Sequence, residues 1–157
     1  MSTILIRPFK SSDTSELIKL FRDAVHAINI KHYSFEQVAA WAPEDIDEEK
    51  WRKKLLEMIV FVAEIGGVIV GFADMSREGY LDHLYIHKDY QGRFIAVHLL
   101  RAIEKAAHEL GLSKITTDCS ITAKLPAERM GFRVIKEQIV ELKGVKMINY
   151  HMEKALK

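Results

Sequence analysis

The sequence predicts a mixed α/β fold, an α+β mixed sheet with helices packed on it, formed as a single domain over residues 1–157. Three observations indicate this class. Short β-branched segments alternate with segments whose apolar residues recur every three or four positions. The length of 157 residues suits one hydrophobic core. Hydrophobic residues make up 48% and charged residues 29% of the chain, which is typical of globular proteins and excludes a disordered one.

The first third of the chain is predicted to form one strand and three helices. Residues 3–9 are short and β-branched, and Pro8 lies near their end, which suits a first strand. Ser34 and Asp47 occupy capping positions before two short helices, of which the first stops at Pro43. Ahead of them, a longer helix is predicted from an apolar stripe that consists of Leu17, Leu20, Phe21, Ala24, Val25 and Ile28.

The remainder of the chain is predicted to contain six strands and two helices. Gly66 and Gly67 favour the positive φ angles of a tight turn, so the segments around them form an antiparallel hairpin. Gly111 supplies a left-handed stop for the long helix before it. The expected strands are residues 59–65, 68–75, 80–87, 114–119, 132–141 and 145–153, and the expected helices are residues 95–110 and 122–130.

Composition excludes several classes of function. The chain has 23 Lys and Arg residues against 22 Asp and Glu residues, so its formal charge of +1 argues against a nucleic-acid or membrane-surface partner. Cys119 is the single cysteine, which excludes an intrachain disulfide and a Cys-rich zinc site, and no metal is expected. No basic segment precedes an apolar run near the start, and no window approaches ~18 uninterrupted apolar residues. These features predict a cytoplasmic protein without a membrane partner.

The segment from Leu84 to Ala96 carries most of the chemical information. It passes from an apolar strand through a polar turn into a helix that starts without a capping side chain. The first turn of a helix has unpaired N–H groups and a partial positive charge, so such a start can hold a phosphate or pyrophosphate. Arg93 could add a charge-assisted bond to the same anion. Because every helix has such an end and most bind only water or a side-chain cap, the pattern by itself favours an ordinary helix start.

Four stretches of the chain share one pattern of motifs: the opening Ile-Arg-Pro-Phe strand, the strand and turn LDHLYIHKDYQGR, the helix AVHLLRAIEKAAHELGL and the late AERMGF element. Together they resemble the GNAT superfamily of acetyl-CoA-dependent N-acetyltransferases, in particular its small stand-alone bacterial members. The turn is similar to the family's Q/R-x-x-G-x-G/A signature, with Gln91 first and Ala96 last. The resemblance therefore covers nearly the whole chain.

This resemblance implies a fold, an activity and a co-substrate site. The fold is a mostly antiparallel sheet of about six to seven strands flanked by about four to five helices. The activity is direct transfer of acetyl from acetyl-CoA to a primary amine in a ternary complex, without an acyl-enzyme. By position, main-chain contacts to the pantetheine arm come from Leu84, Tyr85 and Ile86, contacts to the pyrophosphate come from Gln91, Gly92, Arg93, Phe94, Ile95 and Ala96, and Ser120 stands where the family often has an Asn on the pantetheine arm.

Two positions depart from the family pattern. Phe94 stands where the signature has its middle glycine, and a side chain at a positive φ angle there costs ~1–3 kcal/mol. Either coenzyme binding is weakened, or the ring packs outward and leaves the amides in place. Ala127 stands where many relatives have a Tyr that protonates the departing thiolate. Both departures support an alternative function, a non-catalytic acyl-CoA-binding or interaction module on a degenerate GNAT fold.

The strand before the turn carries the residues that the resemblance implies for catalysis. Transfer to an amine needs a base, because an ammonium with a pKa near ~10.4 has no lone pair to attack a thioester. The family commonly draws that base from this strand, near the places of Tyr80 and Asp82, and Asp82 is the first choice. The alternative is that Asp82 only pairs with a neighbouring Lys or Arg. Strict alternation puts His83 on the face opposite Asp82, which favours a packed or surface histidine.

By the same resemblance, the early helices form the acceptor side. His32, Tyr33 and Trp41 are the polar-aromatic residues there and are the expected substrate-binding residues. The alternative is that Tyr33 and Trp41 only pack in the core. The expected partners are acetyl-CoA and a small-molecule or peptide amine, for a monomer or homodimer. No motif selects among small amines, amino acids, antibiotics and protein amines.

Overall fold

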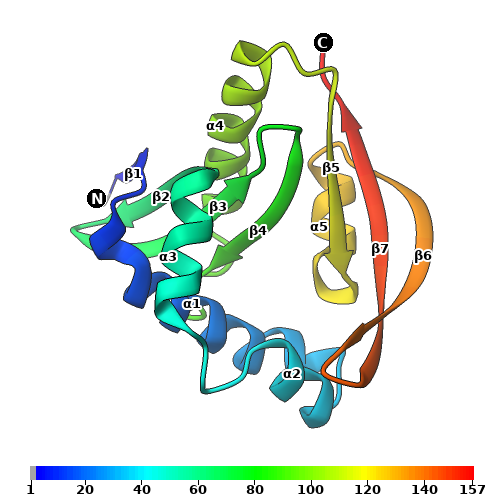
Figure 1. Cartoon of the computed structure of the whole chain (residues 1–157). Coiled ribbons are helices and arrows are strands. Elements are labelled where there is room, and N and C mark those ends of the chain that lie inside the picture. Colours follow the sequence, from blue (N-terminus) through cyan, green and yellow to red (C-terminus); the bar gives the residue numbers. More distant parts are fainter. Residues whose placement is uncertain (1–2) are drawn as a thin grey trace.

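The computed structural model describes residues 3–157, and residues 1–2 lie outside the described part of the chain. Its centre is a sheet of seven strands in the order β1-β2-β3-β4-β5-β7-β6 (Figure 1). Neighbouring strands run antiparallel, except that β4 and β5 run parallel. The strands are β1 (Ile4–Pro8), β2 (Ile59–Ile65), β3 (Val68–Met75), β4 (Tyr80–Ile86), β5 (Lys114–Ser120), β6 (Arg133–Leu142) and β7 (Val145–Ala155).

The helices follow the predicted order, so the mixed α/β fold class is confirmed. In the two long helices, the apolar stripe seen in the sequence forms the buried face of the helix, and this face packs against the sheet. Two 3-10 turns, η1 (Ser11–Asp13) and η2 (Asn29–Lys31), were not predicted. None of the described helices is long and apolar enough to span a membrane. The helices are α1 (Thr14–Ala27), α2 (Phe35–Trp41), α3 (Glu48–Glu57), α4 (Ile95–Glu109) and α5 (Ile121–Arg129).

Two hydrophobic clusters form the core, one on each face of the sheet. Successive residues of β2 divide between them, since Ala63 belongs to the cluster under α4 and Val62 to the cluster under α1, α2 and α3. Gly71 lies where α4 crosses β3. A Cβ at Gly71 would lie 3.0 Å from Ile86 Cδ1 and 3.1 Å from Leu99 Cδ1, so the glycine lets α4 approach the sheet closely.

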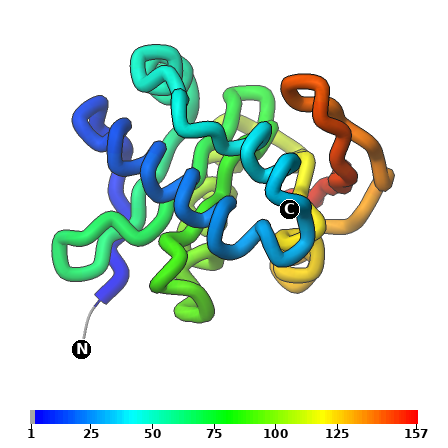
Figure 2. Tube along the Cα trace, turned by 90° about the horizontal axis from the view of Figure 1, so that it is seen from below, coloured from blue at the N-terminus to red at the C-terminus, as the bar shows by residue number. Residues whose placement is uncertain are grey.

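The sheet divides between β4 and β5. In the described chain, these strands pair only at Tyr80 with Thr116 and Leu81 with Thr117, and beyond that point they diverge (Figure 1). On the diverging side, α1 packs against β3 and β4, and α2 packs against β7 (Figure 2). These two consecutive helices therefore bridge the two halves of the sheet at the open end.

A β-bulge interrupts the alternation of β4. Asp74 on β3 pairs with His83 and the next residue, Met75, pairs with Leu81, so Asp82 is an extra residue in β4. Leu81 and Leu84 consequently share the α4-side cluster. The prediction that His83 faces away from Asp82 is wrong, because the bulge breaks the two-residue period, and Asp82 Oδ2 lies 3.8 Å from His83 Nδ1.

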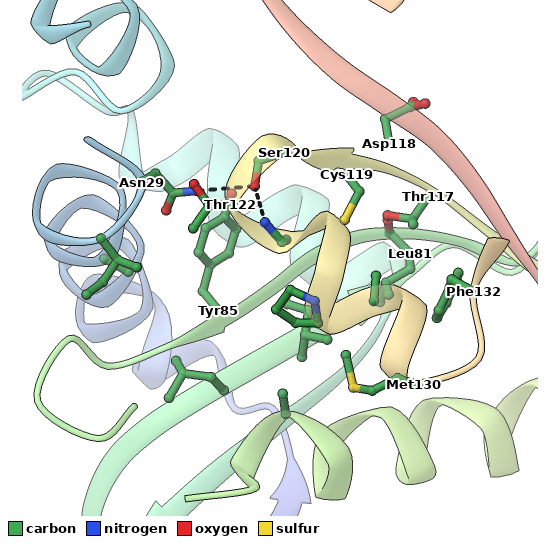
Figure 3. A pocket seen from close by; sticks show the side chains of 18 of the residues that line it. Asn29, Leu81, Tyr85, Thr117, Asp118, Cys119, Ser120, Thr122, Met130 and Phe132 are labelled. Atoms are coloured by element: carbon green, nitrogen blue, oxygen red, sulfur yellow. Dashed lines mark hydrogen bonds between the residues drawn. The ribbon is translucent and has the colours of Figure 1, made fainter. Parts of the chain in front are cut away.

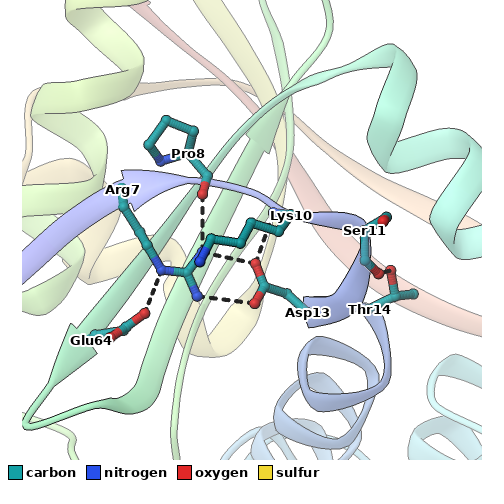
Figure 4. A network of polar contacts seen from close by, with 7 residues as sticks. All are labelled: Arg7, Pro8, Lys10, Ser11, Asp13, Thr14 and Glu64. Carbon is teal, nitrogen blue, oxygen red and sulfur yellow. Dashed lines mark hydrogen bonds and ion pairs between the residues drawn. The ribbon is translucent and has the colours of Figure 1, made fainter.

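A network around Arg7 ties β1 to the start of α1 and to β2 (Figure 4). The Arg7 guanidinium donates two 2.9 Å hydrogen bonds to the Asp13 carboxylate and also pairs with Glu64. Asp13 accepts a further 2.8 Å bond from the Lys10 backbone N–H. Burial acts to raise the pKa of Asp13, but the hydrogen bonds from Arg7 and Lys10 outweigh it and hold that pKa below its ordinary value.

Candidate active site

A cavity of about 230 Å³ lies where β4 and β5 diverge, and side chains of both strands and of α5 converge on it (Figure 3). Most of its wall is apolar, with a few polar groups that could orient a ligand. Residues that line it include Leu81, Asp82, Leu84, Tyr85 and Ile86 of β4, Thr117, Asp118, Cys119 and Ser120 of β5, and Thr122, Ala123 and Ala127 of α5.

β4 presents backbone groups along one side of this cavity. In the described part of the chain, its pairing with β5 stops after Leu81, so the groups that point toward β5 beyond it bond no strand. Leu84, Tyr85 and Ile86 lie here, at the positions expected to contact a pantetheine arm. The Gln91 side chain donates a 2.9 Å hydrogen bond to the Ile86 carbonyl, which fixes the loop against the end of the strand.

The loop before α4 leaves a helix start without a side-chain cap. Phe94 is the N-cap residue, with φ 61° in the left-handed region. Its ring is 75% exposed, so the bulky residue points away from the helix start. Gly92, with φ 76°, has open space around it. The unpaired N–H groups of the first turn of α4 therefore stay accessible to an anion.

A second cavity, of about 410 Å³, lies between α2, the segment before α3, α3 itself, β4 and the β6–β7 turn. Trp41 lines both cavities, so the two adjoin at that side chain. Sequence reasoning missed this cavity, because its wall is assembled from segments distant in the chain. Its lining comprises Phe21, Ala40, Trp41, Pro43, Asp45, Ile46, Asp47, Lys50, Trp51, Lys54, His83, Leu142 and Lys143.

Comparison with known proteins decides the family. A family model described as an acetyltransferase (GNAT) domain matches residues 29–154. This chain belongs to the GNAT family of acetyltransferases. The resemblance to the GNAT superfamily is thereby confirmed.

Individual GNAT relatives resemble the chain over almost its whole length. An uncharacterized N-acetyltransferase, YafP of Escherichia coli K12, is 40% identical over 153 residues, 97% of this chain and 96% of that protein. A GCN5-related N-acetyltransferase structure from Rhodopseudomonas palustris is 32% identical, covers 99% of this chain and 98% of its own, and has a TM-score of 0.94. The fold alone is shared with PaiA N-acetyltransferase of Thermoplasma acidophilum in complex with coenzyme A, at 20% identity, 98% and 99% coverage and a TM-score of 0.79.

As a GNAT enzyme, the protein is an acetyl-CoA-dependent N-acetyltransferase. The geometry fits this co-substrate. The uncapped start of α4 suits the pyrophosphate, and the unpaired edge of β4 suits an amide-bearing arm. Phe94 holds the left-handed conformation with its ring turned out, so the strained backbone keeps the side chain away from the helix start.

Ser120 lines the first cavity, as does Trp41, whereas His32 and Tyr33 are absent from the lining of both cavities and contact the start of α5. The Ser120 hydroxyl caps α5 by accepting a 3.1 Å bond from the Ala123 N–H, and Asn29 Nδ2 donates to it at 3.3 Å. Tyr33 is buried, and its hydroxyl accepts from the backbone N–H that begins α5 and donates to β7, both at 2.8 Å. His32 is exposed, and its Nδ1 lies 2.9 Å from the Thr122 hydroxyl.

The two predicted catalytic residues have different surroundings. Asp82 lines the first cavity and forms an ion pair with Lys54 of α3. Tyr80 donates a 2.8 Å hydrogen bond to Asp118, which also accepts one from His151. Burial, together with Asp118, raises the pKa of Tyr80 far above its ordinary value, so the phenol stays protonated at physiological pH.

His83 is a half-buried polar group that the sequence did not single out as functional. Its Nδ1 lies 2.8 Å from Asp74 Oδ2, and its backbone N–H donates to Asp74 Oδ1 at 3.0 Å. The ring packs among aromatic side chains, with centroids 5.2 Å from Trp51 and 5.5 Å from Phe21. Only the bulge in β4 brings this imidazole beside Asp82, and a strand pattern gives no sign of a bulge.

Cys119 and Tyr85 present the remaining reactive groups of the first cavity. Burial raises the pKa of the Cys119 thiol to about 12, which keeps it neutral and argues against a covalent acyl carrier. Burial also raises the pKa of Tyr85. Among the described residues, no buried side-chain polar atom lacks a partner, and the Tyr85 hydroxyl forms no hydrogen bond, so it reaches the open space of the cavity.

Proposed function

We propose that the enzyme acetylates a compact primary amine with an apolar body, which enters through the second cavity while acetyl-CoA occupies the first. One observation carries this proposal. Trp41 belongs to the walls of both cavities, so an amine in one adjoins an acetyl group in the other. Trp51, Phe21 and Ile46 supply apolar walls to the second cavity, and its Asp side chains suit the ammonium of the amine.

The acetyl-CoA site is assigned residue by residue as part of this proposal. The accessible helix start and the open edge of β4 support it. Backbone and side-chain groups of Gln91, Gly92, Arg93, Phe94, Ile95 and Ala96 hold the pyrophosphate, and Leu84, Tyr85, Ile86 and Ser120 hold the pantetheine arm.

The acceptor side is assigned on the contacts of each residue. Trp41 contacts the amine directly, because it lines both cavities. Tyr33 is occupied at both ends of its hydroxyl, so it shapes the cavity by holding α5 against β7. His32 lines neither cavity and acts on the first one only through its contact with Thr122. Asp82 attracts the ammonium of the amine, and its carboxylate also pairs with Lys54.

The departing thiolate needs a proton donor, since Ala127 cannot serve. Tyr85 fits this role, because its hydroxyl is protonated at physiological pH and reaches the first cavity. Tyr80 does not offer a free hydrogen, because its hydroxyl is bonded to Asp118. A thiolate with a pKa of ~8.5 is a tolerable leaving group near neutrality, so the donor accelerates the reaction without being indispensable.

Calorimetry with acetyl-CoA and thiol release with phenethylamine, tryptamine and spermidine test the proposal. We expect micromolar coenzyme binding and acceptor-dependent thiol release, with kcat/KM at least about tenfold higher for the two aryl amines than for spermidine. Coenzyme binding without release for any of the amines would contradict the proposal and favour the binding module. The cytoplasmic location and a state of one or two copies stay predictions.

A variant of Trp51 separates the two cavities. Trp51 lines the second cavity and is absent from the lining of the first among the described residues. Trp51→Leu should raise KM for phenethylamine about tenfold and leave the acetyl-CoA Kd within about twofold. Phe35→Leu, at a ring that is 75% exposed on α2, is the matched control and should change neither constant. Equal losses for both ligands in Trp51→Leu would place the acceptor elsewhere.

A further inference from the structure

We propose that His83, oriented by the buried carboxylate of Asp74, is the general base that removes a proton from the acceptor amine. This inference rests on the proposed function, since it assigns a role within the proposed acceptor cavity. It replaces the expectation that Asp82 is the base, and it leaves Asp82 the role of attracting the ammonium.

Asp74 fixes the orientation and the tautomer of His83. The carboxylate has no exposed surface, and its two oxygens accept the ring Nδ1–H at 2.8 Å and the backbone N–H at 3.0 Å. A carboxylate only accepts hydrogen bonds, so the neutral imidazole carries its hydrogen on Nδ1. Nε2 is then the nitrogen with a free lone pair, which is the arrangement that a general base needs.

Nε2 of His83 opens onto the second cavity. Among residues 3–157, this atom forms no hydrogen bond, and no side-chain polar atom is both buried and unpartnered, so solvent must reach it. His83 belongs to the wall of the second cavity, where the amine is proposed to bind. Trp51 and Phe21 pack around the ring and hold it in place, with their centroids 5.2 Å and 5.5 Å away.

The charges around His83 suit a base that works near neutral pH. Asp74 faces it from β3, Asp82 from β4 and Lys54 from α3, while α1 contributes the uncharged Phe21. Burial acts to lower the pKa of His83, but the charge and hydrogen bond of Asp74, aided by Asp82, outweigh burial and raise that pKa above 6.5. Lys54 opposes this rise.

The same cluster is not assigned to a metal ion. The ligand atoms of Asp74, Asp82 and His83 lie within 4.8 Å of one another, a spacing that could hold a cation. However, the ammonium of Lys54 already pairs with Asp82, so the chain's own cation takes the place beside this carboxylate. The cluster can still accept a proton, at Nε2 of His83.

The proposed step balances its protons and electrons. One proton of the R–NH₃⁺ group passes to Nε2, and the freed lone pair forms the C–N bond with the thioester carbonyl carbon. The C–S bond breaks, and its electron pair stays on sulfur. Tyr85 donates its hydroxyl proton to the thiolate and regains a proton when the second proton leaves nitrogen, so the products are the N-acetyl amide, the CoA thiol and a protonated His83 that returns its proton to water.

The first test is the pH profile of kcat/KM with phenethylamine for His83→Asn and Asp82→Asn. In the wild-type enzyme, kcat/KM rises with pH as His83 loses its proton, which gives an acidic limb. His83→Asn should lower kcat/KM about 100-fold at pH 7.5 and abolish that limb, while acetyl-CoA affinity by calorimetry stays within about twofold. Asp82→Asn should act mainly on KM and keep the limb. A limb that persists in His83→Asn and vanishes in Asp82→Asn would overturn the inference and make Asp82 the base.

The second test does not depend on turnover. Long-range ¹H–¹⁵N NMR of the histidine rings should show the Nδ1–H tautomer for neutral His83 and a pKa above 6.5. Asp74→Asn removes the charge that raises this pKa, so the titration should move to lower pH, and the acidic limb of kcat/KM should move with it.

Failure of the inference and failure of the proposed function give different results. An enzyme that binds acetyl-CoA but acetylates none of the amines contradicts the proposed function, and the NMR titration then decides about His83 alone. A His83 that carries its hydrogen on Nε2, or whose pKa is unchanged in Asp74→Asn, overturns the inference even if the amines are acetylated.

Discussion

The carboxylates of Asp13 and Asp74 are both buried, and each binds a nitrogen-bearing side chain from a strand. Asp13 binds Arg7 of β1 through two 2.9 Å bonds (Figure 4), and Asp74 binds His83 of β4 through one bond of 2.8 Å. In the first cluster, the guanidinium also reaches Glu64 and the Pro8 carbonyl, so both of its terminal nitrogens and Nε are bonded. In the second cluster, Nε2 of His83 remains open to a cavity.

This difference separates a structural network from a reactive one. A guanidinium stays charged at all physiological pH values and its donors are used, so the Arg7 network can only hold β1, β2 and α1 together. An imidazole changes its charge near neutral pH, and one nitrogen faces solvent. Removing a partner from the first cluster should therefore cost stability, whereas changing the second should alter catalysis.

The largest expected effect is on stability, from Arg7→Met. This change leaves the buried Asp13 carboxylate without its charged partner, so the free energy of unfolding should fall by about 3 kcal/mol. Chemical denaturation at pH 7 measures it. Lys19→Met, which breaks an exposed ion pair with Asp23, is the control and should have a much smaller effect. If Arg7→Met and Lys19→Met lowered the free energy of unfolding equally, the Arg7 network would contribute no more than an exposed ion pair, and its structural role would be contradicted.

The same variant has a defined pH dependence. Since the pKa of Asp13 is lowered in the folded state, the stability gained from this pair is present above the carboxyl's unfolded pKa of ~3.9 and is lost as the pH falls through its folded pKa. The difference between wild type and Arg7→Met should consequently narrow in acid. If the difference in the free energy of unfolding stayed constant from pH 7 to pH 3, packing rather than charge would stabilise the junction of β1, β2 and α1.

Two tyrosines repeat the comparison on a smaller scale. The Tyr33 hydroxyl is bonded on both sides, whereas the Tyr85 hydroxyl is open to the first cavity. Tyr85→Phe should lower kcat about tenfold, close to 1.4 kcal/mol of barrier, and leave the thermal midpoint nearly unchanged. Tyr33→Phe should instead lower stability by about 1–2 kcal/mol, because it removes the acceptor of a backbone N–H. A loss of stability without a loss of kcat in Tyr85→Phe would contradict the proposed proton donor.

Phe94→Gly tests where the strain in the coenzyme loop resides. Glycine adopts φ 61° without the penalty of a side chain, so we expect unfolding to become harder by about 1 kcal/mol. Acetyl-CoA affinity by calorimetry should change less than about threefold, because the Phe94 side chain points away from the helix start. A large gain in affinity would show that the loop rearranges on binding, and a large loss would show that the ring contacts the coenzyme.

The smallest expected effect comes from Lys54→Met. Lys54 is about half exposed, so the free energy of unfolding should change by less than about 1 kcal/mol. Its positive charge lowers the pKa of His83, so its loss should raise that pKa and move the acidic limb of kcat/KM to higher pH. A limb that moves to lower pH would contradict the proposed charge arrangement.

Much of the fold followed from local pattern. The stripe from Leu17 to Ile28, the glycine pair at the turn of residues 66–67 and the alternation of helical and β-branched segments ordered the elements, because they reflect local helix, turn and strand preferences. The uncapped start of α4 could also be predicted from the sequence, since capping depends on neighbouring residues. The same reliance on regular periods placed His83 on the wrong face. A two-residue period was assumed along β4, and the bulge at Asp82 interrupts it.

The sequence by itself determined the order of strands and helices and the family, and it indicated the segment that we propose to bind the coenzyme, because each of these depends on residues close together along the chain. Only the tertiary structure decided that Phe94 turns its ring into solvent, that Trp41 lies between two cavities, and that Asp74 orients His83. These facts depend on which distant segments pack together and on where one extra residue enters a strand, and neither leaves a periodic trace in the sequence.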